Sequence, residues 1–307
     1  MKKLEKEAVL KERFNLVSAV SFFIFILPYV LHLAINGVQI KDTDHFGEIC
    51  QTVMVEMDGR KESIQLEQYL VGALARNSEN SYTNETLKAI AVILRSNAVY
   101  AIAEGETVSR DSFYTDEELH ILWKDEYEIN TQRYREAVKS TEGIVLFYDG
   151  KIVKVPFHML SNGRTRQYDE IVKQKPYLCS VESSEDMYAE KYLTVMELGT
   201  EYIGNDFQVL QKDSFSYVIN VQVKGEKISG EDFCKRYGLP SACFEYYLKG
   251  DKYVFEIRGI GHGFGMSLYG ANSLSQKGWN FAEILQYYYP GIEVRKENRE
   301  DIVAILL

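Results

Sequence analysis

The N-terminal part of this chain contains a long run without charge. From Phe14 to Ile40 the sequence has no Asp, Glu, Lys or Arg, and Leu16–Ile35 is almost entirely apolar. A helix of about 20 such residues is about 30 Å long, which matches the hydrocarbon core of a bilayer. We therefore expect residues 14–37 to form a single transmembrane anchor.

Five cations and three acids precede the anchor, in residues 1–13. Positive residues favour the cytoplasmic side of a membrane, so this tail is expected to stay in the cytoplasm while the rest of the chain crosses. The alternative is a cleaved signal peptide, whose apolar core would be about 7–15 residues long and would end in small residues. The run is longer than that, and Asn36-Gly37-Val38-Gln39 is a poor cleavage site. The pattern favours an uncleaved anchor.

Charge and cysteine content restrict what the outer part can do. The 307 residues include 35 Lys+Arg and 45 Asp+Glu; without the tail 30 and 42 remain, a net charge of −12. An acidic protein lacks the basic surface that displaces counterions from nucleic acid, so no nucleic-acid partner is expected. The four cysteines form no Cys-x-x-Cys or Cys/His cluster with ligand spacing, so no structural metal and no cofactor are expected.

The outer part is expected to contain a polar spacer (residues 38–61) and one folded domain (residues 62–307). Helical periodicity predicts helices at Leu66–Leu74, from Thr83 or Asn84 to Ala103, Asp116–Trp123, Asn130–Ser140, Ser229–Tyr237 and Phe281–Tyr288. Strands are predicted at Ile144–Tyr148, Lys151–Phe157, Phe215–Val223, Tyr253–Arg258 and Ile302–Leu307. Because helices and strands come in blocks, the expected fold is α+β, with mixed helices and antiparallel sheet.

The segment Arg258–Ala271 carries the most distinctive motif. Glycines occupy every second position from Gly259 to Gly265, around His262. Glycine permits backbone conformations closed to other residues and a close approach to a ligand. Neither a Gly-x-Gly-x-x-Gly phosphate motif nor a nucleophile elbow is present. The segment predicts a ligand site, and a tight glycine loop around a core histidine is the alternative.

Glu85 lies in the first turn of the long helix. The apolar stripe of that helix centres almost opposite Glu85, so Glu85, Lys88, Val92 and Arg95 are expected to point away from the core. Acids are common at this position because they complement the positive end of a helix. A catalytic role would instead require burial in a cleft that raises the pKa of the carboxyl.

The stretch Pro156–Thr165 is predicted to be the end of a strand followed by a polar loop. Such loops often carry ligand contacts, so His158 and the residues after it are candidates for binding. The alternative is a solvated hairpin loop with a partly buried histidine.

These stretches, in this order, resemble the stage II sporulation protein D family of bacterial cell-wall lytic transglycosylases. The similar segments are Glu85–Arg95, His158 with Ser161-x-Gly163-x-Thr165, Pro176–Val181 and Gly261–Ala271. The resemblance covers roughly residues 62–296, and a single N-terminal anchor is also usual in the family. It implies cleavage of the β-1,4 bond between N-acetylmuramic acid and N-acetylglucosamine, with formation of a 1,6-anhydro end.

The resemblance also implies roles for individual residues. Glu85 would act alone as general acid and base, first protonating the leaving oxygen and then accepting the proton of the sugar's 6-hydroxyl, so a second carboxylate is not required. Leu268 replaces a glutamine of the family pattern, which removes an amide that could orient a sugar. The residues implied to bind substrate are Arg95, His158, Ser161, Gly163, Thr165, His262, Gly263, Gly265, Met266, Ser267 and Tyr269.

Two functions from different classes follow from the resemblance. The first is a membrane-anchored lytic transglycosylase that acts on peptide-stripped glycan strands during sporulation engulfment, beside a peptidoglycan amidase. It would sit in the cell membrane with a cytoplasmic N-terminus and an extracytoplasmic catalytic domain. The alternative is a non-catalytic glycan-binding module that activates such an amidase, since related proteins are described as amidase enhancers. The alternative keeps the glycine-rich segment and does not need Glu85.

Overall fold

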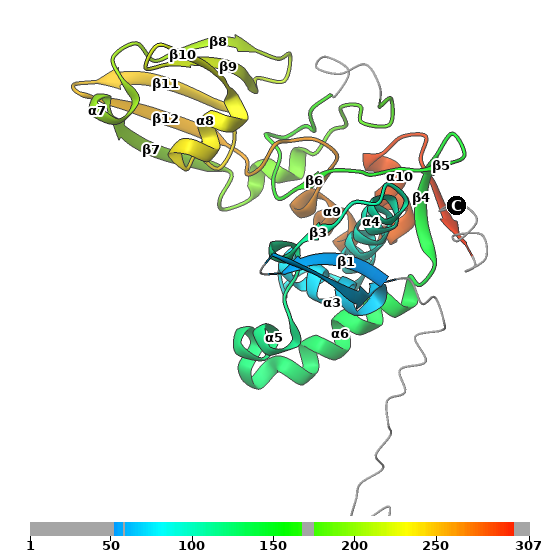
Figure 1. Cartoon of the computed structure of the whole chain (residues 1–307). Coiled ribbons are helices and arrows are strands. Elements are labelled where there is room, and N and C mark those ends of the chain that lie inside the picture. The colour runs from blue at the N-terminus through cyan, green and yellow to red at the C-terminus, as the bar shows by residue number, and fades with distance from the viewer. Residues whose placement is uncertain (1–51, 58, 168–174, 298–307) are drawn as a thin grey trace, which may run out of the picture. The chain divides into compact units, whose positions relative to one another are not determined.

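The computed structural model (Figure 1) describes residues 52–57, 59–167 and 175–297. The expected cytoplasmic tail (residues 1–13), the expected anchor (residues 14–37) and the expected closing strand (Ile302–Leu307) lie outside the described residues. The account below concerns the described residues alone.

These residues form a mixed arrangement of helices and sheets, which confirms the α+β expectation for this part of the chain. The α-helices are α3 (Leu66–Arg76), α4 (Asn84–Ala103), α5 (Asp116–Trp123), α6 (Tyr127–Ser140), α7 (Thr200–Ile203), α8 (Gly230–Tyr237), α9 (Leu268–Gln276) and α10 (Phe281–Tyr288). Short 3₁₀ helices are η2 (Arg110–Ser112), η3 (Lys124–Glu126) and η4 (Ser184–Tyr188).

The strands are short and pair mostly with antiparallel neighbours. They are β1 (Thr52–Met57), β2 (Arg60–Gln65), β3 (Val108–Ser109), β4 (Ile144–Tyr148), β5 (Lys151–Ile152), β6 (Phe157–His158), β7 (Leu193–Gly199), β8 (Gln208–Lys212), β9 (Val218–Val223), β10 (Glu226–Ser229), β11 (Phe244–Lys249), β12 (Lys252–Arg258), β13 (Met266–Ser267) and β14 (Glu293–Lys296). The sheet orders are β2-β1-β3, β14-β4-β5, β13-β6, β11-β12-β7 and β10-β9-β8. Two pairs are parallel, β1 with β3 and β13 with β6.

Buried apolar side chains form two separate cores. The first lies among α3, α4, α5, α6, α9 and α10 with the sheets β2-β1-β3 and β14-β4-β5, which we call the helical lobe. The second lies in residues 193–257, the sheet lobe, where Phe207, Phe233, Phe244 and Phe255 pack with ring centroids 4.9–5.9 Å apart. The glycine-rich segment follows β12 of the sheet lobe and leads into α9 of the helical lobe.

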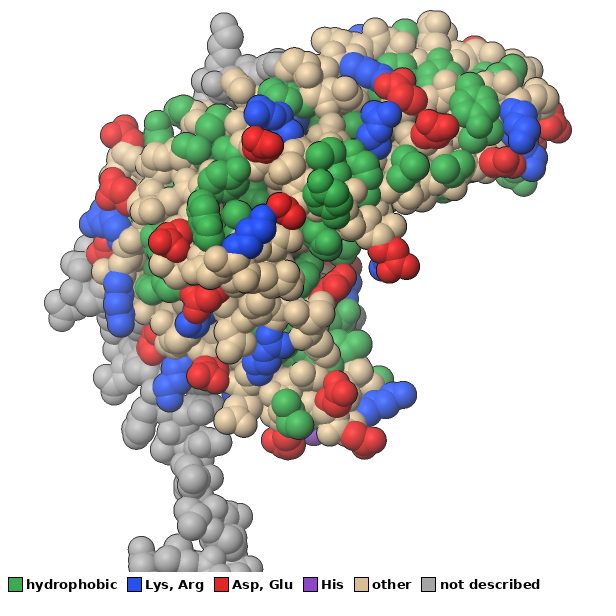
Figure 2. Space-filling model, turned by 180° about the vertical axis from the view of Figure 1, so that it is seen from behind, with side chains coloured by type: hydrophobic (Ala, Val, Ile, Leu, Met, Phe, Trp, Pro, Cys, Tyr) green, Lys and Arg blue, Asp and Glu red, His purple; other side chains and the backbone are tan. Residues whose placement is uncertain are grey.

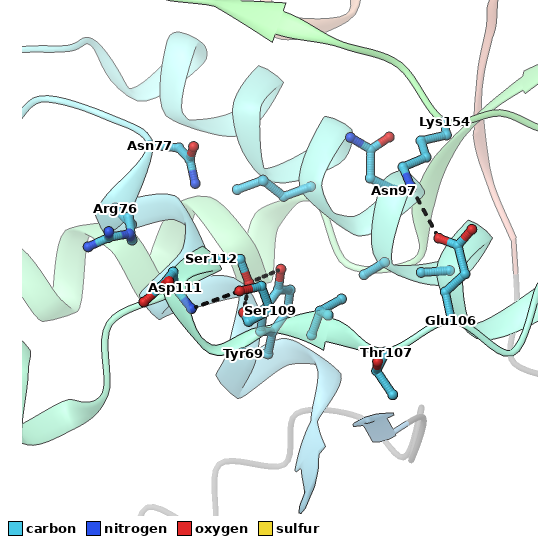
Figure 3. Close-up of a pocket in the computed structure, with 14 residues that line it drawn as sticks. Tyr69, Arg76, Asn77, Asn97, Glu106, Thr107, Ser109, Asp111, Ser112 and Lys154 are labelled. Atoms are coloured by element: carbon cyan, nitrogen blue, oxygen red, sulfur yellow. Dashed lines mark hydrogen bonds and ion pairs between the residues drawn. The ribbon is translucent and has the colours of Figure 1, made fainter. Parts of the chain in front are cut away.

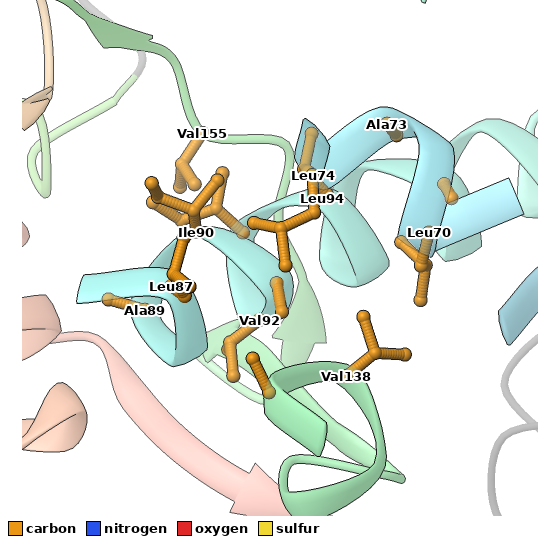
Figure 4. Packing of buried hydrophobic residues seen from close by; sticks show 14 of the residues in the cluster. Leu70, Ala73, Leu74, Leu87, Ala89, Ile90, Val92, Leu94, Val138 and Val155 are labelled. Carbon is orange, nitrogen blue, oxygen red and sulfur yellow. The ribbon is translucent and has the colours of Figure 1, made fainter. Parts of the chain in front are cut away.

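Helix α4 lies at the centre of the helical lobe. The hydroxyl of Thr83 caps its first turn by accepting a bond from the backbone N–H of Thr86, which confirms the predicted start. Figure 4 shows side chains of α3, α6 and the segment after β5 packed around α4. Within the described residues, α4 is also long and apolar enough to cross a membrane, but 72% of its most apolar window is buried, as in a core helix of a folded domain.

The expected orientation of α4 is wrong at two positions. Val92 and Arg95 were expected to face away from the core, yet they are 0% and 1% exposed. The reason is that α3 and α6 pack on one side of the helix while α9 and α10 pack on another, so the helix has no fully solvated face over most of its length. An amphipathic stripe identifies the most apolar side of a helix and does not show what covers its other sides.

Arg95 forms a buried ion pair. Its guanidinium donates two hydrogen bonds to the carboxylate of Glu67, at 2.9 and 2.8 Å, and the two side chains are 1% and 6% exposed. It also donates to the carbonyl oxygens of Val138 and Thr141. The expectation that Arg95 binds substrate is therefore wrong, because its guanidinium is buried and bonds within the protein, where it joins α4 to α3 and to the end of α6.

The expected spacer is also too long. Residues 38–61 were predicted as a polar spacer, but β1 and β2 pair as an antiparallel hairpin from Thr52 onward. Val53 and Val55 of β1 are 1% and 0% exposed. Alternate side chains of β1 thus complete the core beneath α3 and α4, which a spacer would not do.

Charged side chains of both signs are interspersed on the face of the molecule seen in Figure 2. Exposed ion pairs, such as Lys252 with Glu197 and Lys277 with Glu185, neutralise part of this charge locally. The acid excess of the sequence is therefore not gathered into a single patch on that face.

We expect Arg95→Met to lower the free energy of unfolding by about 3–5 kcal/mol, because it leaves the Glu67 carboxylate buried without a partner. The double variant Glu67→Gln with Arg95→Met should recover part of that loss. Urea unfolding followed by circular dichroism measures both. Lys252→Met, which breaks an exposed pair, is the matched control and should cost less than about 1 kcal/mol. Equal losses in Arg95→Met and the control would contradict a stabilising role for the buried pair.

Candidate functional site

The two stretches that were predicted to bind a ligand lie side by side. Strand β6 pairs in parallel with β13, which follows directly on the glycine-rich segment. Leu160, after β6, and Ile260, within the glycine-rich segment, form a further bridge with hydrogen bonds of 3.1 and 2.8 Å. The loop after β6 and the glycine-rich segment therefore build one site.

Glycine is required where these two segments touch. Gly261 has a φ of 101°, and a Cβ at this position would lie 2.9 Å from the Cβ of His158. Gly265 has a φ of 70°, and a Cβ there would collide with the carbonyl oxygen of Pro156. Both the backbone angle and the lack of space exclude a side chain. The close approach that these glycines permit is to the protein's own chain, which is the packing role considered as the alternative above.

His158 and His262 form a pair with complementary ring nitrogens. Their ring centroids are 5.9 Å apart. Nδ1 of His158 lies 3.1 Å from the carbonyl oxygen of Phe264, so it carries the proton and Nε2 is an acceptor. Nδ1 of His262 accepts a bond from the N–H of Phe264 at 3.0 Å, which leaves the proton of the neutral ring on Nε2. The pair offers one acceptor and one donor.

Burial keeps both rings uncharged. His158 is 4% exposed, and burial, with a smaller effect of His262, lowers the pKa of its imidazole to about 3. Burial, with a smaller effect of the Arg166 guanidinium, lowers the pKa of His262. Within the described residues Nε2 of His158 has no hydrogen-bond partner. A buried polar atom without a partner is uncommon, and a ligand hydroxyl would satisfy it.

Asp186, on η4, holds the two segments together and was not identified from the sequence. Its carboxylate accepts bonds from the backbone N–H of Ser161 at 2.8 Å, from the Ser161 hydroxyl, and from the Ser267 hydroxyl at 2.9 Å. Burial raises the pKa of Asp186. Ser161 and Ser267 are both 0% exposed, so in this structure they hold the two segments together beneath the surface of the site.

Arg166 is a second residue that the sequence did not reveal. It forms ion pairs with Asp213 and with Glu231, and its backbone N–H donates to the carbonyl oxygen of Gly263 at 2.7 Å. Its guanidinium lies between two aromatic rings, 4.8 Å from the centroid of Tyr217 and 4.6 Å from that of Phe264. Arg166 therefore fixes the glycine-rich segment to the sheet lobe.

A pocket of about 270 Å³ opens beside His158, and we call it the histidine pocket. It is lined by Arg76, Asn77, Ser78, Glu79, Tyr82, Phe157, His158, Met159 and Leu268. It contains one of the predicted binding residues, His158, and also Leu268, the position at which the family glutamine is missing. Its other wall is the turn between α3 and α4, which sequence reasoning did not single out. The signal was the polar run Asn77–Ser81, which lies two residues before the cap of α4 at Thr83.

Glu85 is not among the residues that line the histidine pocket. Its carboxylate pairs with Lys88 at 2.7 Å and accepts a bond from the backbone N–H of Phe281, the first residue of α10, at 2.9 Å. Its side chain is 31% exposed. Both partners are donors, so this carboxyl links α4 to α10, and its predicted catalytic role stays a proposal. Among the residues that line the histidine pocket, the carboxyl belongs to Glu79.

The remaining predicted residues have mixed positions. Thr165 and Met266 are fully buried, and the hydroxyl of Thr165 accepts a bond from the N–H of Val181 at 2.8 Å. Gly163 has a φ of 104° and donates its N–H to the hydroxyl of Ser161. These residues build the loop and do not line the histidine pocket. Tyr269 is partly exposed at the start of α9 and keeps its predicted role as a proposal.

The described cysteines are buried or half-buried thiols. Cys179, Cys234 and Cys243 are unpaired, and Cys50 lies outside the described residues. Burial raises the pKa of the Cys234 thiol to about 12. Among the described residues no group of three or more His, Cys, Asp or Glu side chains is placed to hold a metal ion.

Comparison with known proteins groups this chain with bacterial proteins named for sporulation. A family model described as stage II sporulation protein matches residues 59–148. Stage II sporulation protein D of Bacillus amyloliquefaciens is 30% identical over 257 residues, which cover 76% of this chain and 75% of the relative. The protein of the same name from Bacillus subtilis (strain 168) gives the same identity and coverage. The chain belongs to the stage II sporulation protein D family.

A shorter similarity points to a differently named protein. The amidase enhancer of Bacillus subtilis (strain 168) is 48% identical over 40 residues, which cover 13% of this chain and 6% of that protein. An uncharacterized protein of Brachyspira hyodysenteriae is 24% identical over 260 residues, 77% of this chain and 68% of the relative.

His158 should make the stability depend on pH between about 6.5 and 5. The folded state keeps this ring neutral because its pKa is lowered to about 3, whereas in the unfolded chain the imidazole takes up a proton near its ordinary pKa of 6.5. Below pH 6.5 the unfolded state therefore binds more protons, and the free energy of unfolding falls by up to about 1.4 kcal/mol per pH unit.

Urea unfolding of the wild type and of His158→Asn at several pH values between 5 and 6.5 checks this. The substitution should remove that part of the slope, because asparagine does not titrate. Other groups titrate equally in both proteins, so the difference between the slopes isolates His158. Identical slopes would show that the ring is not kept neutral by the fold.

Proposed function

We propose that this protein binds the glycan strands of peptidoglycan in the histidine pocket and works beside a peptidoglycan amidase during sporulation. The observation that carries this proposal is His158, which lines the pocket and whose buried acceptor nitrogen has no partner within the described residues. A sugar hydroxyl can donate a hydrogen bond, so it would satisfy this acceptor.

The rest of the histidine pocket suits a sugar ring. Tyr82, Phe157 and Leu268 supply apolar faces, against which the C–H face of a pyranose packs. Asn77 and Glu79 supply polar groups at the edge. Binding sites for small ligands commonly combine an apolar lining with a few placed polar groups.

The link to an amidase rests on the relative that is named an amidase enhancer. Glycan binding alone is enough for such a role, because a protein that holds the strand can keep an amidase on it. This role does not need Glu85, whose contacts with Lys88 and with α10 are structural. We further propose that residues 14–37 anchor the protein as a single span, with the N-terminus in the cytoplasm and the glycan site outside.

A lytic transglycosylase is the second candidate function. The observation that favours it is that Glu79 lines the same pocket as His158. A carboxyl there would protonate the glycosidic oxygen of the leaving sugar and would then accept the proton of the 6-hydroxyl as this oxygen closes the 1,6-anhydro ring. The acid in this reaction would be Glu79, from its place in the pocket, or Glu85, from the resemblance.

Filling the histidine pocket should weaken glycan binding. Met159 lines it and is 41% exposed, so Met159→Trp adds bulk without opening the core. We expect its affinity for amidase-treated sacculi to fall by about tenfold or more, which corresponds to about 1.4 kcal/mol. Co-sedimentation of the full-length protein in mild detergent measures the change. Met54→Trp on β1, 39% exposed and outside this pocket, is the control and should bind as the wild type does. Unchanged binding in Met159→Trp would exclude the histidine pocket as the glycan site.

The two candidate functions differ in their products. If the protein only binds glycan, mass spectrometry should find no anhydro-muropeptides after incubation with amidase-treated sacculi, and Glu79→Gln and Glu85→Gln should bind glycan as well as the wild type does. Release of anhydro ends that is abolished by Glu79→Gln or by Glu85→Gln would establish the transglycosylase and identify its acid. Release that persists in both variants would exclude both carboxyls.

A further inference from the structure

Strand β7 forms one edge of the sheet β11-β12-β7 in the sheet lobe, where Figure 1 shows it as the outer arrow. It pairs with β12 along its whole length, from Leu193 opposite Arg258 to Gly199 opposite Lys252. Within the described residues no strand pairs with its other side. The backbone N–H and C=O groups on that side therefore form an open edge, which a further strand can complete.

The side chains on the outer face of β7 also suit strand pairing. Alternate residues of a strand lie on one face, so Leu193, Val195 and Glu197 share this face. Leu193 and Val195 are 56% and 59% exposed. Glu197 pairs with Lys252 of β12 at 3.2 Å. Two exposed aliphatic side chains thus form a short apolar row beside the open edge, and aliphatic pairs across two strands stabilise their contact.

The longer edge strands elsewhere in the described sheets are protected by cations. A lysine or arginine on an edge strand disfavours pairing with another chain. Apart from β7, every described edge strand of four residues or more carries one: β2 at Arg60 and Lys61, β8 at Lys212, β10 at Lys227, β11 at Lys249 and β14 at Arg295 and Lys296. Strand β7, Leu-Thr-Val-Met-Glu-Leu-Gly, contains no Lys, Arg or Pro.

The remaining described edge strands are only two residues long, which is shorter than an ordinary strand. One of them, β3, borders a pocket of about 380 Å³ (Figure 3). There the hydroxyl of Ser109 accepts a bond from the N–H of Asp111, and Lys154 pairs with Glu106 at 3.2 Å. Polar groups beside this short edge thus bond within the protein. Among the described edges, β7 is the long one without protection.

We propose that β7 is the contact through which two copies of this chain associate, strand against strand, antiparallel about a two-fold axis. Such a contact places the same strand on both sides, so β7 must complement itself. With Val195 opposite Val195 of the second copy, Leu193 lies opposite Glu197 of that copy. This register joins the two apolar rows and sets no like charges opposite each other. A register with Glu197 opposite Glu197 would be unfavourable.

The charges beside β7 favour a second copy as the occupant. Arg258 lies opposite Leu193 on β12, so one row across the joined sheet holds Arg258, Leu193 and then Glu197 of the second copy. Neighbouring strands are about 4.8 Å apart, which separates this cation and this acid by about 10 Å, whereas the two Glu197 positions are about 14 Å apart. The contact therefore places unlike charges nearer to each other than the two acids.

Cysteine substitution tests this register. Residues that face each other in an antiparallel pair have Cβ atoms about 5 Å apart, from which a small movement reaches disulfide distance. The full-length protein in mild detergent, oxidised gently and run on non-reducing gels, should give disulfide-linked dimers with Val195→Cys. Ile121→Cys, 74% exposed on α5 of the helical lobe, is the matched control. Its dimers should form about tenfold more slowly, because they depend on chance collision. The wild type gives the background of the native cysteines.

A cation at the same position should prevent the association. In sedimentation velocity of the full-length protein in mild detergent, we expect the wild type to pass from monomer to dimer as its concentration rises. Val195→Lys should stay monomeric, whereas Ile121→Lys should still dimerise. Both positions are exposed, so neither change should lower the free energy of unfolding by more than about 0.5 kcal/mol, which urea unfolding checks.

Three results would overturn the inference. They are a wild type that stays monomeric, a dimer that survives Val195→Lys, and cross-linking of Val195→Cys no faster than that of Ile121→Cys. The first would leave the β7 edge to a strand of a different protein. Neither measurement depends on glycan binding, so the outcome does not affect the proposed function.

Discussion

Backbone pairing between β6 and β13 brings together residues that lie about a hundred positions apart in the chain, and the site depends on it. The pairing places the carbonyl oxygen of Phe264 at 3.1 Å from Nδ1 of His158, a contact that spans 106 positions. That single bond fixes the tautomer of His158 and therefore leaves its Nε2 as an acceptor. It is available only because Gly261 and Gly265 carry no side chain. Asp186 and Arg166 then hold the paired segments from the two sides.

Several parts of this arrangement were predictable because their signals are local. The starts of α4, α8 and α10 were predicted to within a residue, and each start is capped by a side chain that bonds its own helix. The spacing of the glycines marked the segment that approaches another part of the chain closely. The order of His158 and His262 in recognisable stretches indicated a shared site, although only the fold shows how their nitrogens complement one another.

Other parts were not predictable because their partners are distant in the sequence. The partner of Arg95 is Glu67, 28 positions away. Asp186 is likewise distant in the sequence from its partners Ser161 and Ser267, so it was not identified as part of the site. A charged residue on a helix is predicted to be exposed as long as its partner is unknown, because burying an unpaired charge is unfavourable. Glu85 shows the converse: its position at a helix start was predicted correctly, but its second contact, with the N–H of Phe281, lies 196 positions away and makes it a link between helices.

The net charge of the whole chain is a poor guide to what its histidine pocket binds. At physiological salt, exposed charges more than about 8 Å apart are largely screened from one another. Most acids of the described residues are surface groups, and several pair with neighbouring lysines. A ligand in the histidine pocket therefore responds chiefly to the charged residues that line it, which are Arg76 and Glu79. One cation and one carboxyl line this pocket, so the charge of −10 carried by the sequence as a whole does not indicate the charge of the group that binds there.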